Sequence, residues 1–150
     1  MIRHEVSADV VAVNTVEQAS EADVIPEFRT VATLETPMDA LCVALCLQYS
    51  SDEDDLGAYK RAIGRVVGTD GMSLVFGLVD HKHSPSRCVK LDMRDMGDPC
   101  ADAASLGRVL LTMASMGVNG TPRWIHPDLA DKFREIQPAG PTDFGVRAAA

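Results

Sequence analysis

Apolar side chains follow strand-like patterns in five stretches of the chain. Residues 28–35 are rich in β-branched and apolar side chains, residues 72–79 form a continuous apolar run, and residues 123–126 read Arg-Trp-Ile-His. Each of these three patterns predicts a strand, and the continuous run is typical of a strand that is covered on both faces. Residues 5–14 are rich in Val and predict a short strand, whereas residues 87–93 fit either a short strand or an irregular connection.

Three other stretches carry patterns that favour helices. Residues 38–48 are nearly all apolar and follow a Thr-Pro pair, which suits an N-cap and the first helical position. Residues 52–67 repeat apolar side chains at helical spacing, and Gly68 supplies a C-terminal cap. Residues 100–116 begin after an Asp-Pro pair, repeat apolar side chains in the same way and stop at Gly117. We therefore predict three helices.

The predicted elements alternate in an order that indicates one two-layer α/β domain with a mixed sheet. Residues 132–137 alternate between polar and apolar side chains, so we predict them as a strand that forms a hairpin with residues 123–126. We divide the chain into an N-terminal extension at 1–27, a domain at 28–140 and a C-terminal tail at 141–150. The tail is either a loose segment or a frayed helix.

The composition restricts the partners. The chain has 150 residues, of which 46% are hydrophobic, and its net charge is −8. An acidic protein is repelled by a phosphate backbone and by an anionic membrane, so we expect neither nucleic acid nor membrane as its partner. The sequence shows no apolar stretch of the roughly 20 residues that a membrane span needs and no secretory signal. We therefore expect a cytoplasmic protein with reduced thiols.

One loop resembles a known family. Residues 117–122 read Gly-Val-Asn-Gly-Thr-Pro between a predicted helix and a predicted strand. This loop resembles that of thioredoxin-like proteins, especially the disulfide isomerases of the Dsb type, and the resemblance extends in element order over residues 28 to about 140. It implies a thioredoxin-like fold and a cis bond between Thr121 and Pro122. It also implies that a peptide pairs with the backbone edge at Gly120, Thr121 and Pro122.

The catalytic motif of that family is missing. Its Cys-x-x-Cys lies at the start of the first helix, where the helix N-terminus lowers the pKa of the thiol. In this chain the corresponding residues 37–40 read Pro-Met-Asp-Ala and contain no thiol. We therefore expect a non-catalytic module that binds a protein or peptide and needs no cofactor. The alternative is a thiol-disulfide oxidoreductase or isomerase that uses unusual cysteines, such as Cys88 and Cys100.

The four cysteines allow two structural interpretations. Cys42 and Cys46 are four residues apart on a predicted apolar helix, which favours a place in the core. Some Dsb-type isomerases have a second, structural cysteine pair near the position of Cys100, so the resemblance suggests a disulfide between Cys88 and Cys100. A reducing compartment would instead leave both thiols free.

Two further features have a structural and a functional interpretation each. Asp80, His81, His83 and Cys88 are close in sequence and could hold a metal ion in a small regulatory protein, but their spacing matches no known zinc pattern. We favour a solvated loop and expect no metal. Trp124 follows the Thr-Pro turn, and we favour a core position for it; pointing outward, it would anchor a partner.

Overall fold

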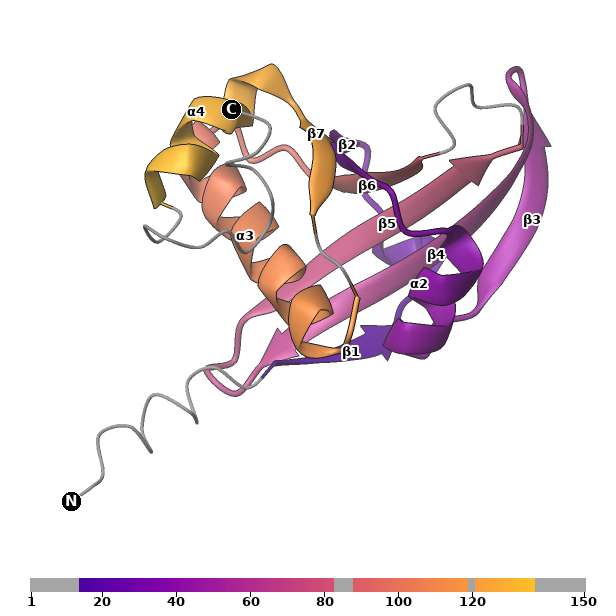
Figure 1. The fold of residues 1–150 in the computed structure, drawn as a ribbon, viewed down its shortest axis with the longest axis horizontal. Coiled ribbons are helices and arrows are strands. Elements are labelled where there is room, and N and C mark those ends of the chain that lie inside the picture. The colour runs from indigo at the N-terminus through magenta and orange to yellow at the C-terminus, as the bar shows by residue number, and fades with distance from the viewer. Residues whose placement is uncertain (1–13, 83–87, 119–120, 137–150) are drawn as a thin grey trace.

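The computed structural model describes residues 14–82, 88–118 and 121–136 of the chain. The elements follow one another as β1 (Asn14–Gln18), a 3-10 turn (Glu21–Asp23), β2 (Phe28–Leu34), α2 (Met38–Leu45), β3 (Tyr49–Asp54), β4 (Gly57–Gly68), β5 (Ser73–His81), β6 (Val89–Arg94), α3 (Pro99–Ser115), β7 (Pro122–Ile125) and α4 (Pro127–Ile136) (Figure 1). The protein is therefore of the α/β type. The predicted strands at 28–35, 72–79 and 123–126 are confirmed as β2, β5 and β7, all in one sheet.

The sheet has seven strands in the order β1-β4-β5-β6-β2-β7, and β3 pairs with the first half of β4. Every pairing is antiparallel, so the prediction of a mixed sheet is wrong. The prediction assumed a helix between the first two long strands. Instead, β3, β4, β5 and β6 follow one another directly, and strands that are joined by short turns pair antiparallel.

The helix predicted over residues 52–67 is wrong, because this segment forms β3 and most of β4. Gly64 lies opposite Phe76 of β5, and a Cβ atom on Gly64 would be 2.6 Å from the Phe76 ring. The strand therefore needs a glycine at a position that faces the core. That glycine conceals the alternating pattern of the strand, while the chance spacing of the remaining apolar side chains imitates a helix.

The other predicted helices are confirmed. The segment predicted at 38–48 contains α2, which ends at Cys46 in the left-handed conformation with φ of 56°. The segment predicted at 100–116 is α3, and Asp98 caps it by accepting a hydrogen bond from the Cys100 amide at 3.0 Å. The uncertain segment 87–93 contains β6. The strand predicted over 5–14 lies outside the described residues except for Asn14, which begins β1.

Residues 132–137 do not form the predicted hairpin strand, because residues up to Ile136 belong to α4. Pro127 occupies the start of the helix, where its missing N–H is not needed. Leu129 and Phe133 lie four residues apart on one helical face, and both are fully buried. The alternation of polar and apolar side chains over six residues was too short to distinguish a strand from this helix.

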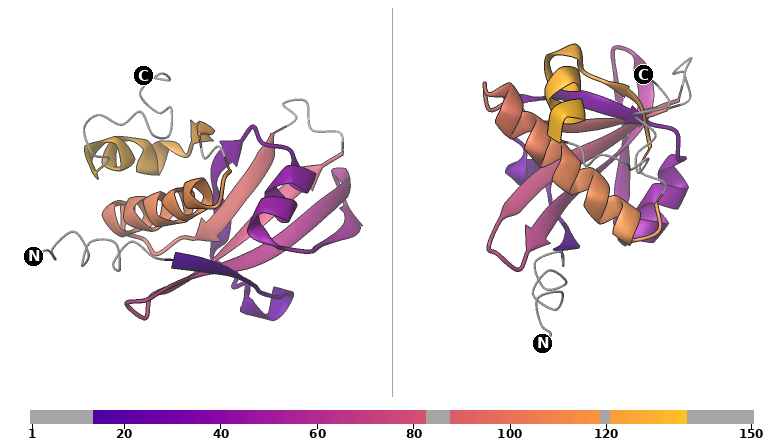
Figure 2. Two further views of the ribbon diagram at one scale, coloured as in Figure 1. Left: turned by 60° about the horizontal axis from the view of Figure 1, so that its bottom comes forward. Right: turned by 60° about the vertical axis from the view of Figure 1, so that its left-hand side comes forward.

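One hydrophobic core lies between the helices and one face of the sheet (Figure 2). Its fully buried large side chains come from β2, α2, β5, β6, α3 and α4, and they are Leu34, Leu41, Leu45, Phe76, Leu78, Leu91, Leu106, Leu110, Met113, Leu129 and Phe133. In the part of the chain that the structure describes, no helix combines the length and apolar character that crossing a membrane requires.

The 3-10 turn is held to β4 by ion pairs. Asp23 lies 2.8 Å from Arg65 and Glu21 lies 3.2 Å from Arg61. Asp23 also accepts a hydrogen bond from the Ser20 amide, and this bond together with the Arg65 guanidinium lowers the pKa of the Asp23 carboxyl. The segment between β1 and β2 is therefore fixed against the sheet.

Candidate functional site

β7 forms one end of the sheet. It pairs with β2 on one side, where Thr33 lies opposite Trp124 and Leu34 lies opposite Pro122. The register shifts between Thr33 and Leu34, next to Pro122, which has no N–H to donate to the ladder. No strand among the described residues pairs with the other side of β7, so this side is an open sheet edge.

The hydrogen bond that follows β7 fixes the direction of its backbone groups. The His126 amide donates to the Val31 carbonyl of β2 at 2.9 Å. Because successive residues of a strand alternate in direction, the backbone groups of Trp124 also face β2. The N–H and C=O groups of Ile125, between Trp124 and His126, therefore face the open edge. The register shift makes Arg123 an extra residue of β7, so the alternation does not extend to its backbone groups. The two groups of Ile125 can pair with one short extended segment.

The side chains of this edge are partly exposed. Trp124 is 42% exposed, so the core position that we favoured for it is wrong, and its ring instead meets His126 edge-on at 5.8 Å. Arg123 is exposed and lies 3.3 Å from Glu35. Pro122 is buried and Ile125 packs against the core. The edge therefore combines a rigid attachment with an aromatic side chain that a partner can reach.

The start of α4 stabilises the end of β7. The imidazole Nδ1 of His126 accepts a hydrogen bond from the Asp128 amide at 3.0 Å. The backbone carbonyl of His126 accepts hydrogen bonds from the amides of Leu129 and Ala130. His126 thus caps α4 directly after the strand. Sequence reasoning missed this role of His126 because it predicted a hairpin, and not a helix, after residues 123–126.

Arg29 of β2 joins three elements behind this edge. Its guanidinium lies 3.3 Å from Asp128 at the start of α4, 3.3 Å from Asp102 of α3 and 3.6 Å from Asp95. Asp102 is buried and also accepts a hydrogen bond from the Met96 amide. A pocket of about 290 Å³ beside Arg29 is lined by these carboxylates. The network ties β2 to the helix that follows β7.

The Thr121–Pro122 bond is trans, because none of the described peptide bonds is cis, and the cis prediction is therefore wrong. The chain reverses without a cis bond because α3 ends in a Schellman motif. Gly117 has φ of +89°, and the Val118 amide donates to the Met113 carbonyl at 3.0 Å. Among the predicted peptide-binding residues, Pro122 begins β7 and Thr121 precedes it, while Gly120 lies outside the described residues.

The segment at residues 37–40 lies where the resemblance places the catalytic thiols. Pro37 is the N-cap of α2 and Met38, its first residue, is buried. Leu34, three residues earlier, lies opposite Pro122. The loop before β7 and the start of α2 therefore meet at one end of β2, but this place carries no thiol.

None of the four cysteines forms a disulfide bond in the structure. Cys42 and Cys88 are buried, whereas Cys46 and Cys100 are exposed. The prediction of a core position thus holds for Cys42 and is wrong for Cys46, which lies beyond the last turn of α2. Burial, with a further contribution from the Asp39 carboxylate, raises the pKa of the Cys42 thiol and makes it less reactive.

The candidate metal ligands are not assembled into a site. Within the described residues, no group of three or more His, Cys, Asp or Glu side chains could hold a metal ion. His81 ends β5 and lies 3.0 Å from Asp54 of β3, and the Tyr59 ring is next to it at 5.3 Å. His83 lies outside the described residues.

Comparison of this chain with protein-family models, with curated proteins and with solved structures gave no match.

Proposed function

We propose that this protein is a non-catalytic interaction module that binds an extended protein segment along the open edge of β7. The observation that carries the proposal is that this edge strand presents the backbone groups of Ile125 next to the half-exposed ring of Trp124. Main-chain pairing would supply affinity, and contacts with Trp124 would supply specificity.

Two properties of the site support this mode of binding. The strand is held on its other side by β2 and at its end by the cap of α4, so binding requires little ordering of the site. The strand is also short, at four residues, which limits the edge-to-edge aggregation that long open strands cause.

The thioredoxin-like resemblance supports the proposal only through the position of its loop in the fold. The Gly-Thr-Pro loop leads into the proposed edge, and Pro122 lies beside the end of β2. The trans bond and the antiparallel sheet differ from what we expected of that fold, so the function is argued from the edge and not from the fold family. Cysteines without disulfide bonds are compatible with the reducing cytoplasm as the proposed compartment.

A substitution of Ile125 tests the proposal at the backbone. The Ile125→Pro variant removes an N–H that faces the open edge and leaves the bonds between β7 and β2 in place. The matched control is Ile125→Ala, which also truncates the side chain that packs against the core but keeps the N–H. Heptapeptides selected on the wild-type protein from a random display library are then titrated against each variant, with Trp124 fluorescence as the readout.

We expect the selected peptides to bind the wild type and Ile125→Ala with similar affinity, and to lose roughly tenfold or more in affinity for Ile125→Pro, as a lost main-chain hydrogen bond and a blocked edge predict. Because Trp124 is the only tryptophan, its emission reports on this edge alone. Thermal unfolding verifies that the variants fold. Equal binding to Ile125→Ala and a folded Ile125→Pro would refute the proposal.

A reduction assay distinguishes the alternative function, thiol-disulfide exchange, from non-catalytic peptide binding. We expect insulin reduction in dithiothreitol to proceed at the background rate, because Cys88 is buried and residues 37–40 hold no thiol. Activity that disappears in a Cys88→Ser/Cys100→Ser variant would instead establish an enzyme.

A further inference from the structure

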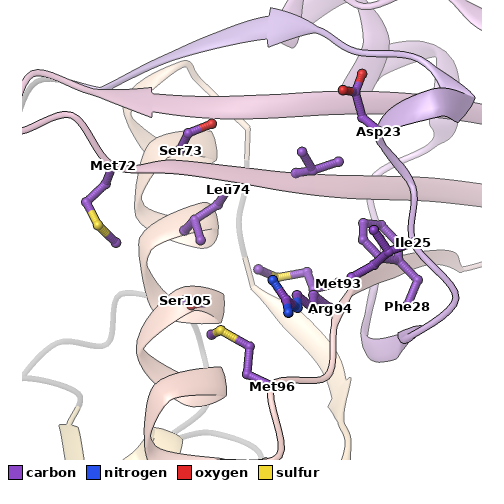
Figure 3. A pocket seen from close by; sticks show the side chains of 11 residues that line it. Asp23, Ile25, Phe28, Met72, Ser73, Leu74, Met93, Arg94, Met96 and Ser105 are labelled. Atoms are coloured by element: carbon purple, nitrogen blue, oxygen red, sulfur yellow. The ribbon is translucent and has the colours of Figure 1, made fainter.

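A second feature, a pocket of about 360 Å³, lies on the side of β2 opposite to β7, at the end of β6 (Figure 3). Its volume is near the lower end of the roughly 300–1,000 Å³ that is usual for small-molecule sites. The lining is mainly apolar, and its apolar side chains are Ile25, Phe28, Met72, Leu74, Val75, Met93 and Met96.

The pocket exists because two neighbouring strands differ in length. β5 pairs with β6 only over Phe76–Val79, and the first three residues of β5 extend beyond the end of that pairing. The space next to this extension is bounded by Ser105 of α3 and by the segment that leads into β2. Figure 3 shows Met72 and Leu74 on one side of the space and Ile25 and Phe28 on the other.

Three methionines line the pocket. Met93 is buried, whereas Met72 is 47% exposed and Met96 is 43% exposed. Unbranched methionine side chains are flexible and polarizable, so they adapt to apolar ligands of different shape. Large apolar side chains that are half exposed around a hollow are also typical of a binding site rather than of a closed core.

Arg94 is the polar group of this pocket that has no counter-charge among the described residues. The other arginines in the described part of the chain each form an ion pair with a carboxylate, and they are Arg29, Arg61, Arg65, Arg108, Arg123 and Arg134. Arg94 forms none with a described residue, although the chain has a net charge of −8. The acid among the described lining residues, Asp23, is paired with Arg65 at 2.8 Å.

From this combination we infer that the pocket binds a small molecule with an apolar body and one carboxylate group. The apolar body would lie between Leu74, Met93 and Phe28, and the carboxylate would pair with the Arg94 guanidinium, which forms two-point hydrogen bonds with planar anions. The site is separate from the β7 edge and does not depend on the proposed peptide binding.

Methyl NMR tests this inference with the protein's own side chains as probes. The protein is labelled with ¹³C at the methionine methyl groups and titrated with octanoate, and with octanol as an uncharged ligand of the same length. We expect octanoate to shift the methyl signals of Met72, Met93 and Met96. The signals of Met38 and Met113, which are buried elsewhere in the core, should stay in place.

A charge variant tests the role of Arg94. We expect Arg94→Gln to weaken octanoate binding roughly tenfold or more, because a charge-assisted hydrogen bond is lost, and to leave octanol binding unchanged. Arg134→Gln removes an exposed arginine of α4, far from the pocket lining, and should bind octanoate like the wild type. Arg94 is exposed, so the variant should keep its fold, which its methyl spectrum verifies.

Three results would overturn the inference: no shift of the three pocket methyl signals at millimolar octanoate, equal octanoate affinity of Arg94→Gln and wild type, or equal affinity of the wild type for octanol and octanoate. Shifts confined to Met38 or Met113 would place the ligand in the core instead and would also overturn it.

Discussion

Gly64 is a residue at which the fold tolerates little change. A Cβ atom at this position would lie 2.6 Å from the Phe76 ring and 3.1 Å from Leu47. Both side chains are buried, so the ring must move within a packed core. We expect Gly64→Ala to lower the free energy of unfolding by about 1–3 kcal/mol, as measured by urea denaturation.

Gly77 provides the matched control on the neighbouring strand. A Cβ atom there meets only Asp92, at an ordinary contact distance of 3.7 Å. Gly77→Ala should therefore leave the stability unchanged or raise it slightly, because alanine loses less backbone entropy on folding. If Gly64→Ala were as stable as Gly77→Ala, the close packing of Phe76 on β4 would be wrong.

The thiols provide a second prediction at the scale of single residues. Cys46 and Cys100 are exposed, whereas Cys42 and Cys88 are buried, and burial raises the pKa of the Cys42 thiol. We expect a disulfide reagent such as Ellman's reagent to modify two thiols quickly in the native protein and all four in urea. Peptide mapping should locate the fast sites at Cys46 and Cys100. Rapid modification of Cys42 would contradict the packing of α2.

At the scale of the elements, the sequence predicted most reliably the segments whose local signals agree with their tertiary environment. The apolar run of β5 and the capped helix α3 are of this kind. β4 was misread because its core-facing Gly64 carries no side chain, so a pattern of hydrophobicity cannot register it. The requirement for glycine comes from Phe76, which lies on another strand. The local periodicity of the β4 sequence contains no information about that contact.

The candidate site shows the same limit. The position of the Pro122 loop between a helix and a strand was predictable from local sequence. That β7 ends the sheet was not, because strand order depends on pairing between distant segments. The exposure of Trp124 and the lack of a described carboxylate beside Arg94 likewise depend on which side chains the fold brings near them. No local pattern contains that information.

α4 supplies a prediction about how one element supports another. Phe133 is fully buried, and the helix follows His126, whose amide donates a hydrogen bond to Val31 of β2. We expect Phe133→Ala to cost about 3–5 kcal/mol in the free energy of unfolding, because it leaves a cavity between α3 and α4. Amide hydrogen exchange in β7 should become faster in this variant, since the cap that ends the strand is then less stable.

Lys132→Ala is the control for this helix. Its side chain is 43% exposed and its ion pair with Glu135 lies within α4, so its removal should change the stability by less than about 0.5 kcal/mol. An effect of Phe133→Ala as small as that of Lys132→Ala would mean that α4 does not pack on the core.

At the scale of the whole molecule, three aspartates connect distant parts of the fold. Asp23 ties the 3-10 turn to β4, Asp54 of β3 pairs with His81 at the end of β5, and Asp70 in the turn after β4 pairs with Arg108 of α3. The pKa of each carboxyl is lowered in the folded state, chiefly by hydrogen bonds from the Ser20 amide, His81 and Arg108 respectively. Each carboxylate is therefore a link whose strength depends on pH.

The direction of the pH dependence follows from these lowered pKa values. An aspartate with a folded pKa below its unfolded value of about 3.9 binds fewer protons when folded, so its contribution is complete above that value. The contribution is lost as the pH falls through the folded pKa. We expect the contribution of these groups to the urea midpoint of unfolding to stay constant between pH 7 and about pH 5. Below about pH 4 this contribution should decrease steeply.

The Asp70→Asn variant tests this dependence. It should have a lower urea midpoint than the wild type at pH 7, because the pair with Arg108 is lost, and the difference should shrink as the pH falls below about 4, where the wild type loses the same pair. Asp131→Asn changes the same charge on α4, where the carboxylate is 84% exposed and pairs only within its own helix. It should follow the wild-type profile. A difference between Asp70→Asn and wild type that stays constant down to pH 2 would show that Asp70 does not connect the β4–β5 turn to α3 through its charge.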